Sequence, residues 1–213
     1  MSAYIEFQNV KKIYKMGEVE IQALAGVDFT IDKGEFVVIA GASGAGKSTI
    51  LNILGGMDSS TSGNIFVDGT EISKFNAKQL TTYRRYDIGF VFQFYNLVQN
   101  LTVKENVELA TQICKQPLDI DETIEAVGLK ERASNFPAQL SGGEQQRVAI
   151  ARALAKNPKL LQDTCRQRGV SVVVITHNLA LTAMGDKVIK VRNGKIDSIT
   201  INEHPLPVER IEY

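Results

Sequence analysis

Residues 41–48 combine the residue types that can enclose a phosphate group. They match the pattern G-x-x-x-x-G-K-[ST], in which glycines let the backbone curl so that successive N–H groups face an anion. A helix that begins at the end of such a loop adds its positive N-terminus. Lys47 is predicted to reach the β- and γ-phosphates of a nucleotide, and the Ser48 hydroxyl to bind Mg²⁺. The predicted phosphate-binding residues are Gly41, Ala42, Ser43, Gly44, Ala45, Gly46, Lys47, Ser48 and Thr49.

The segments on either side fit this interpretation. Phe36 to Ala40 is short and continuously apolar, as expected of a strand buried on both faces of a parallel sheet. Lys47 to Leu54 is predicted to form a helix that ends at Gly55. An accidental glycine-rich turn is the simpler alternative, and the strand–loop–helix context argues against it. The loop alone names no reaction, because kinases, GTPases and transport ATPases share it.

A second anion site is predicted at residues 140–147, which read Leu-Ser-Gly-Gly-Glu-Gln-Gln-Arg. Ser141 and Glu144 have the spacing of a capping box, which opens a helix running to about Lys156. The two glycines between them permit close approach to a backbone whose N–H groups point at the site. A plain helix start would need the serine and the glutamate but not two adjacent glycines.

Residues 140–147 resemble the signature motif of the ATP-binding cassette (ABC) family, and the whole chain follows that family's order of motifs. The resemblance implies that the signature of one subunit contacts the γ-phosphate of ATP held by the phosphate loop of another. Two head-to-tail copies would then enclose two ATP molecules, with Mg²⁺ as the metal. The residues implied are Ser141, Gly142, Gly143 and Glu144.

Three further residues stand where the family carries functional side chains. Tyr14 lies at the position of an aromatic residue that stacks on adenine, and a flat ring suits a base. Gln93 follows a predicted strand and resembles the Q-loop glutamine, which contacts Mg²⁺ and the attacking water. His177 follows another predicted strand and resembles the switch histidine near the γ-phosphate. Each also has a purely structural interpretation, as a strand-end tyrosine, a strand-end polar residue or a structural histidine.

Residues 55–58 and 90–97 resemble segments of one subgroup, the lipoprotein-release, macrolide-export and peptide-export cassettes. Such chains pair with a separate or fused transmembrane permease, so the resemblance implies a peripheral position on the inner face of the cell membrane. The subgroup is also similar to a cell-division cassette.

The expected fold class is α/β. The resemblance implies a P-loop NTPase (RecA-like) core with an N-terminal antiparallel β subdomain and a helical subdomain insert. We expect one nucleotide-binding domain over residues 1–213, with β-rich parts at about 1–35 and 60–75 and a helical insert at about 94–140. Turn dipeptides at Asp68-Gly69 and Asn193-Gly194 predict two hairpins, and a capping box at Thr102 predicts a helix through about Lys115.

Composition restricts the partners. Lys and Arg total 24 and Asp and Glu total 24, so the basic excess of a general nucleic-acid binder is missing. No apolar run approaches the ~20 residues of a membrane span, and the first residues do not read as a signal peptide. Two distant cysteines, Cys114 and Cys165, suit a reducing compartment. We expect a soluble, cytoplasmic chain that reaches a membrane only through a partner.

One expected part of the family pattern is missing. The family carries a Walker B strand ending in Asp-Glu, followed by a D-loop and a helix. Only 12 residues, 159–170, separate Asn157-Pro158 from the predicted strand at Ser171. A strand and its crossover need more. Either Leu160 to Asp163 is a decayed Walker B, with Thr164 in place of the glutamate, or Leu160 to Arg168 is the end of the later helix.

We prefer the second placement, which leaves about 20 residues absent near 159–162. The natural protein is expected to carry them, because a sheet without its central strand leaves backbone groups unpaired. If the deletion is real, little or no ATP hydrolysis is expected. The leading hypothesis remains the ATPase subunit of a membrane transporter. The alternatives are an ATP-binding but non-hydrolytic module on a membrane partner and a catalytically dead chain. A chromosome-maintenance ATPase is rejected, because Gln93 and Ser141 are 48 positions apart without sustained heptads, and the signature disfavours a small-molecule kinase.

Overall fold

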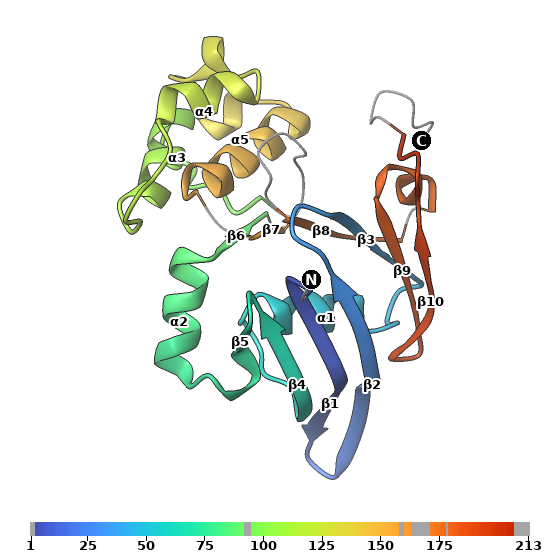
Figure 1. The fold of residues 1–213 in the computed structure, drawn as a ribbon. Coiled ribbons are helices and arrows are strands. Elements are labelled where there is room, and N and C mark those ends of the chain that lie inside the picture. The colour runs from blue at the N-terminus through green and yellow to red at the C-terminus, as the bar shows by residue number, and fades with distance from the viewer. Residues whose placement is uncertain (1–2, 92–94, 158–159, 163–170, 178, 207–213) are drawn as a thin grey trace. The chain divides into compact units, whose positions relative to one another are not determined.

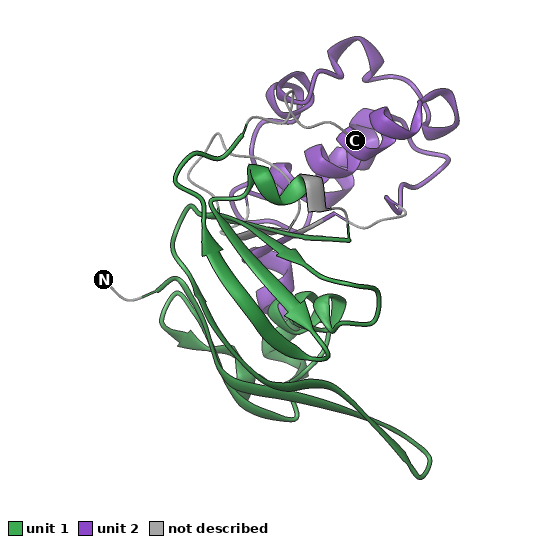
Figure 2. Cartoon of the chain, turned by 90° about the vertical axis from the view of Figure 1, so that its right-hand side faces the viewer, with its two compact units in different colours: residues 1–81, 165–213 green, residues 82–164 purple. Residues whose placement is uncertain are grey.

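The structure, a computed structural model, describes residues 3–91, 95–157, 160–162, 171–177 and 179–206. The chain divides into two compact units (Figure 2). The first consists of residues 1–81 and 165–213, and the second of residues 82–164. The order of the elements along the chain can be followed by colour in Figure 1. Helix α2 (Ala77–Tyr86) runs across the boundary between the two units.

The first unit contains an antiparallel sheet with the order β2-β1-β4-β5. Its strands are β1 (Ile5–Met16), β2 (Val19–Ile31), β4 (Ser62–Val67) and β5 (Thr70–Glu71). Asp68 and Gly69 join β4 to β5 with φ values of 50° and 71°. A two-residue hairpin turn with positive φ at both positions favours this residue pair, so the predicted turn is confirmed.

The same unit holds a mainly parallel arrangement with the order β10-β9-β3-β8. Strand β3 (Phe36–Ala40) pairs in parallel with β8 (Ser171–Thr176) on one side and β9 (Lys187–Arg192) on the other. All five residues of β3 are buried, which confirms the strand predicted from its unbroken apolar run. Strand β10 (Lys195–Ile201) returns antiparallel to β9 through the predicted Asn-Gly turn.

Helix α1 (Lys47–Leu54) follows β3 and confirms the predicted strand–loop–helix order. Two 3₁₀ helices complete the described part of this unit. They are η1 (Ile72–Lys74) and η4 (Leu179–Met184).

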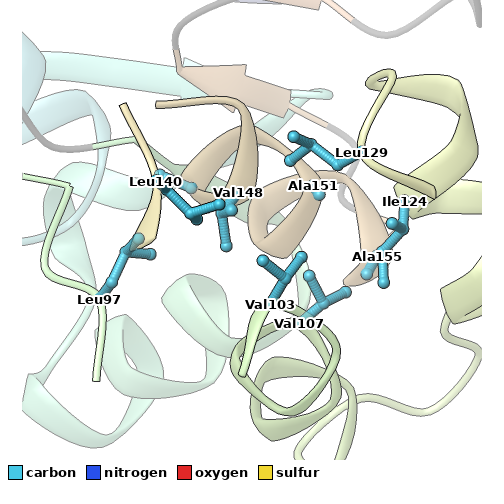
Figure 3. Close-up of a cluster of buried hydrophobic side chains, with 10 residues drawn as sticks. Leu97, Val103, Val107, Ile124, Leu129, Leu140, Val148, Ala151 and Ala155 are labelled. Atoms are coloured by element: carbon cyan, nitrogen blue, oxygen red, sulfur yellow. The ribbon is translucent and has the colours of Figure 1, made fainter. Parts of the chain in front are cut away.

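The second unit is built on three helices that share an apolar core (Figure 3). They are α3 (Val103–Thr111), α4 (Ile120–Ala126) and α5 (Gly142–Ala155), with the 3₁₀ helices η2 (Lys130–Arg132) and η3 (Pro137–Gln139) between the last two. The buried core residues are Leu97, Val103, Val107, Ile124, Leu129, Leu140, Val148, Ala149, Ala151 and Ala155.

Helix α3 begins as predicted and ends early. The Thr102 side chain accepts from the backbone N–H of Glu105, and the Glu105 carboxylate accepts from Thr102, so the capping box is confirmed. The helix ends at Thr111 instead of Lys115. The Thr111 hydroxyl donates to the Glu108 carbonyl at 2.7 Å, which is the kind of local bond that competes with helix continuation.

The preferred placement of residues 160–168 as a helix end is wrong for its first three residues. Leu160–Gln162 forms the strand β7, which pairs in parallel with β6 (Ile88–Phe90). A short Leu-Leu run does not distinguish a strand from a helix by its periodicity. Pairing also satisfies backbone groups that a lone β6 would leave without partners in the sheet. Asp163, Thr164 and the rest of that segment lie outside the described residues.

A buried amide ties the start of α3 to the segment before it. Asn106 is fully buried, and its Nδ2 lies 2.9–3.0 Å from the carbonyl oxygens of Val98, Leu101 and Thr102. Its Oδ1 accepts from the Val98 N–H at 2.9 Å. The two N–H hydrogens of the amide are thus shared among three carbonyl oxygens, and its oxygen accepts from a fourth backbone group, which an apolar side chain could not do.

We expect Asn106→Ala to lower the free energy of unfolding by about 3 kcal/mol, because the buried backbone groups lose their partner. Urea unfolding followed by circular dichroism measures this. The control is Asn100→Ala, since Asn100 is exposed. Equal stability of the two variants would contradict the assigned network.

Candidate functional site

The phosphate loop lies between β3 and α1, and two of its glycines are dictated by their surroundings. A Cβ atom on Gly41 would lie 2.3 Å from the carbonyl oxygen of Val191, closer than any real contact. Gly46 has a φ of 107° and a Cβ on it would lie 2.8 Å from the carbonyl oxygen of Ala23. The loop can therefore follow this path only with glycine at these two positions.

The N-terminus of α1 presents its backbone N–H groups without a cap from the protein. Gly46 is the N-cap residue, and within the described residues no side chain caps it and no acidic residue stands in the first turn. Helices α3 and α5 instead carry complete capping boxes. The four free N–H groups of a helix start need partners, and the positive end of the helix favours an anion. An anion at α1 would supply what a capping side chain supplies elsewhere.

Lys47 places a positive charge over the same loop. Its Nζ donates to the carbonyl oxygens of Gly41 and Ala42, at 2.9 and 2.8 Å. The ammonium group is thus held against the loop by neutral acceptors. A phosphate oxygen is a stronger acceptor, because its hydrogen bond with an ammonium joins two charges. Ser48 is exposed beside Lys47, so its hydroxyl is open to a ligand.

His177 and the phosphate loop begin at the same edge of the sheet. Ala40 and Thr176 are register partners in the parallel pair of β3 and β8. Gly41 and His177 are the next residues on neighbouring strands, which run about 4.8 Å apart. His177 is exposed. This edge, at the carboxyl ends of parallel strands, is where α/β proteins hold ligands.

Tyr14 is tied to both ends of α1. Its hydroxyl donates to Asp58 Oδ2 at 2.8 Å, just beyond the helix, and is hydrogen-bonded to the Thr49 side chain in the first turn. Burial raises the pKa of Tyr14, and the hydrogen bond to Asp58 raises it further. The predicted base-stacking residue therefore belongs to the same part of the first unit as the phosphate loop.

The predicted second anion site occupies the start of α5 in the second unit. The Ser141 hydroxyl donates to Glu144 Oε2 at 2.8 Å and accepts from the Glu144 N–H at 3.3 Å. The hydrogen bonds that Ser141 donates from its backbone and its hydroxyl hold the pKa of Glu144 below its ordinary value, and Arg132 adds to this. The capping box is confirmed.

Gly142 and Gly143 have no structural reason to be glycine within the described chain. Neither has a positive φ, a Cβ on Gly142 would meet nothing within 4 Å, and one on Gly143 would meet only the tip of Arg147 at 3.9 Å. Each glycine in a helix costs about 1 kcal/mol relative to alanine. The two residues therefore destabilise α5 without a packing reason among the described residues.

Gln93 lies outside the described residues, but the segment after it is anchored by a residue that the sequence did not reveal. Arg152 of α5 donates to the carbonyl oxygens of Tyr95 and Asn96, at 2.7 and 2.6 Å. Both of these residues have positive φ values, 56° and 48°. Burial lowers the pKa of Arg152. No motif marks this contact, because it joins residues more than 50 positions apart.

A central parallel strand that ends in a glycine loop before an uncapped helix defines a P-loop nucleotide-binding protein. A family model described as "ABC transporter" matches residues 24–162. The chain therefore belongs to the ABC transporter family, a family of ATPases. Within the described residues, no helix has the length and apolar character needed to cross a membrane.

Relatives support the same family. An uncharacterized ABC transporter ATP-binding protein of Thermotoga maritima is 41% identical, over 93% of this chain and 96% of its own length. The lipoprotein-releasing system ATP-binding protein LolD of Shewanella frigidimarina is 38% identical, over 90% and 91%. A putative ABC transporter ATP-binding protein of Mycoplasma pneumoniae is 40% identical over 98% of this chain, which spans only 50% of that protein.

The fold is that of a solved cassette. A dimeric structure of the ATP-binding cassette MJ0796, described as a post-hydrolysis state bound to ADP and Pi, superposes with a TM-score of 0.82. It is 37% identical and covers 92% of this chain and 98% of its own. MJ0796 comes from Methanocaldococcus jannaschii.

The relatives carry residues that this chain does not. The alignment with the Mycoplasma pneumoniae protein covers 233 positions and this chain has 213 residues, so at least 20 positions stand opposite a gap in this chain. The match to the family model ends at Gln162, the last residue of β7. The absence of about 20 residues near 159–162 stays a prediction, because neither observation gives the position of a gap.

We expect Gly41→Ala to weaken ATP binding by about tenfold or more, because the loop must move away from Val191 and the N–H groups lose their alignment. Titration calorimetry measures the dissociation constant. Lys33→Ala is the control, since Lys33 lies in an exposed turn outside the loop. An unchanged affinity in Gly41→Ala would show that the loop does not hold the nucleotide.

Proposed function

We propose that this chain is the ATP-binding subunit of a membrane export or lipoprotein/peptide transport complex and works as a head-to-tail dimer. The observation that carries the proposal is the uncapped start of α1, preceded by a glycine loop and covered by Lys47. This arrangement suits a polyphosphate, because it offers N–H groups, a helix dipole and the ammonium group of Lys47.

Different residues of the site bind different parts of the nucleotide. Residues 41–49 hold the phosphates, with Lys47 on the β- and γ-phosphates, and the ring of Tyr14 stacks on the base. Mg²⁺ fits here only as a nucleotide-bound ion, held by Ser48 and Gln93, because the described residues include no cluster of three or more His, Cys, Asp or Glu side chains that could bind a metal. When bound, the ion neutralises phosphate charge. His177 contacts the γ-phosphate from the neighbouring strand.

Two glycines at the start of α5, Gly142 and Gly143, support the proposed dimer. Residues 141–144 of one copy face the γ-phosphate held by the other, with Gly142 and Gly143 allowing backbone approach. The solved relative MJ0796 is described as dimeric and bound to ADP and Pi. One Shigella flexneri relative, 37% identical, is an export ATP-binding/permease protein. By analogy, the dimer sits on a transmembrane permease at the inner face of the membrane.

A second function is favoured by the missing positions. A Walker B strand supplies the carboxylates that hold Mg²⁺ and polarise the attacking water, and residues 159–170 include a single carboxylate, Asp163. With at least 20 aligned positions absent, the chain as sequenced would bind ATP and turn it over poorly. It would then act as a non-hydrolytic module that passes a conformational signal to its membrane partner.

We expect no ATP hydrolysis above background from this chain, because a P-loop without Walker B carboxylates lacks the group that orients water. Replacing residues 159–170 with the corresponding, longer segment of the Thermotoga maritima relative is expected to raise turnover to about 1 per second, a typical enzyme rate. Phosphate release measures both.

Lys47→Ala in the extended chain is the negative control for that assay, and intact mass confirms the length of each chain. Ordinary turnover by the unextended chain would contradict the non-hydrolytic function. Failure of both chains to bind ATP would contradict the proposed function as a whole.

We expect Gly143→Ala to stabilise the fold by about 1 kcal/mol, because alanine favours a helix. The same change is expected to weaken ATP-dependent dimerisation by about tenfold, because a methyl group would stand in the contact surface. Thermal unfolding and sedimentation velocity give the two quantities. Glu108→Ala, at an exposed position of α3, is the control. A variant that dimerises normally would exclude the signature contact.

A further inference from the structure

We propose that Asp58 is a positioning residue that holds the ring of Tyr14 in place for the nucleotide base, with Lys12 as its counter-ion. This inference rests on the proposed stacking role of Tyr14. It assigns a role to the first charged residue after α1 and to a lysine on β1, two positions before Tyr14.

The Asp58 carboxylate is shared between three donors. Oδ2 accepts from the Tyr14 hydroxyl at 2.8 Å. Oδ1 accepts from Lys12 Nζ at 2.6 Å and from the Ser59 N–H at 2.7 Å. A carboxylate can accept several bonds at once, whereas a neutral amide of the same size has only one acceptor oxygen. The charge is what allows one side chain to hold both the lysine and the tyrosine.

Lys12 is buried, and its ammonium group contacts Asp58 and the Tyr14 ring instead of solvent. Only 9% of the residue is exposed, and its Nζ also donates to the Ser59 carbonyl at 2.7 Å. The same Nζ lies 4.8 Å from the centre of the Tyr14 ring. A cation at that distance is attracted to the ring. Lys12 therefore helps hold Tyr14 in two ways, through Asp58 and through the ring.

The protonation states support this bonding. Burial by itself would raise the pKa of Asp58, but the hydrogen bonds from Lys12, Tyr14 and the Ser59 N–H outweigh it and keep that pKa below its ordinary value. The pKa of Tyr14 is raised, first by burial and then by Asp58. At neutral pH the carboxylate is thus charged and the phenol protonated, which are the forms that this hydrogen bond needs.

The hydrogen bonds to the Tyr14 hydroxyl lower the conformational entropy that stacking of a base on its ring would cost. A free tyrosine on an exposed strand end would lose rotamer freedom when a base stacks on it. Asp58 and Thr49 fix the ring hydroxyl to the two ends of α1 before any ligand arrives. Such preorganisation raises affinity for the part of the ligand that contacts the ring and leaves the phosphate contacts unaffected.

The test compares ATP with inorganic tripolyphosphate, which has the phosphates and no base, by titration calorimetry on the full chain. We expect Asp58→Asn and Tyr14→Phe each to weaken ATP binding by about 3- to 10-fold, the effect of one mobilised side chain. The double variant should show no further loss, because both changes break one interaction. Tripolyphosphate affinity should stay unchanged. Asp68→Asn, with the same charge change at an exposed turn, should alter neither affinity.

Other results would overturn one of these roles. If Asp58→Asn weakens ATP and tripolyphosphate equally, Asp58 only supports the loop, and the positioning role is overturned. If it changes neither, the role is likewise overturned. Tyr14→Ala separates this proposal from the one it rests on. If Tyr14→Ala weakens the binding of ATP but not of tripolyphosphate, while Asp58→Asn weakens neither, only the role of Asp58 is removed. If the ratio of ATP affinity to tripolyphosphate affinity is unchanged in Tyr14→Ala, the stacking role itself is removed.

Discussion

The parallel pairing of β3 with both β8 and β9 is the constraint on which the rest of the site depends. All five residues of β3 are buried, and Ala40 is in register with Thr176 on one side and with Lys190 on the other. Three segments therefore leave the sheet at one edge: the phosphate loop, the segment of His177 and the end of β9. The crowding there also explains Gly41, since the Val191 carbonyl leaves no room for a Cβ.

Two helix starts show how one structural element serves two purposes. Helix α1 has no capping side chain among the described residues, so its N–H groups remain available to a ligand. Helix α5 is capped by Ser141 and Glu144, yet carries two glycines that its own packing does not require. In the proposed function, the ligand replaces the cap of the first helix. In the second, the cap fixes the helix start, and the proposed partner approaches over the glycines. Both helix starts at which binding is proposed are therefore less stable than a capped helix start without glycine would be.

The missing positions change the expected chemistry more than the fold. Within the described residues, the strand β7 spans Leu160–Gln162 and pairs in parallel with β6. A TM-score of 0.82 to the cassette MJ0796, over 92% of this chain, shows that the chain has the fold of that cassette. The glycine loop before α1 and the capped start of α5 are present, and residues 159–170 hold a single carboxylate, Asp163. The proposed non-hydrolytic function would separate nucleotide binding from nucleotide hydrolysis.

By itself, the sequence determined the elements with strong local signals. The buried strand β3, the phosphate loop, both Asx-Gly hairpins and both capping boxes depend on residues within a few positions of one another, so spacing alone predicted them. Tertiary structure decided the rest. The strand at Leu160 exists because β6 offers it a partner, and the hydrogen bond from Arg152 to Tyr95 joins distant segments. The Lys12–Asp58–Tyr14 cluster forms only when β1 lies beside the segment that follows α1. Such contacts depend on which distant backbone lies nearby, and no local pattern of residue types carries that information.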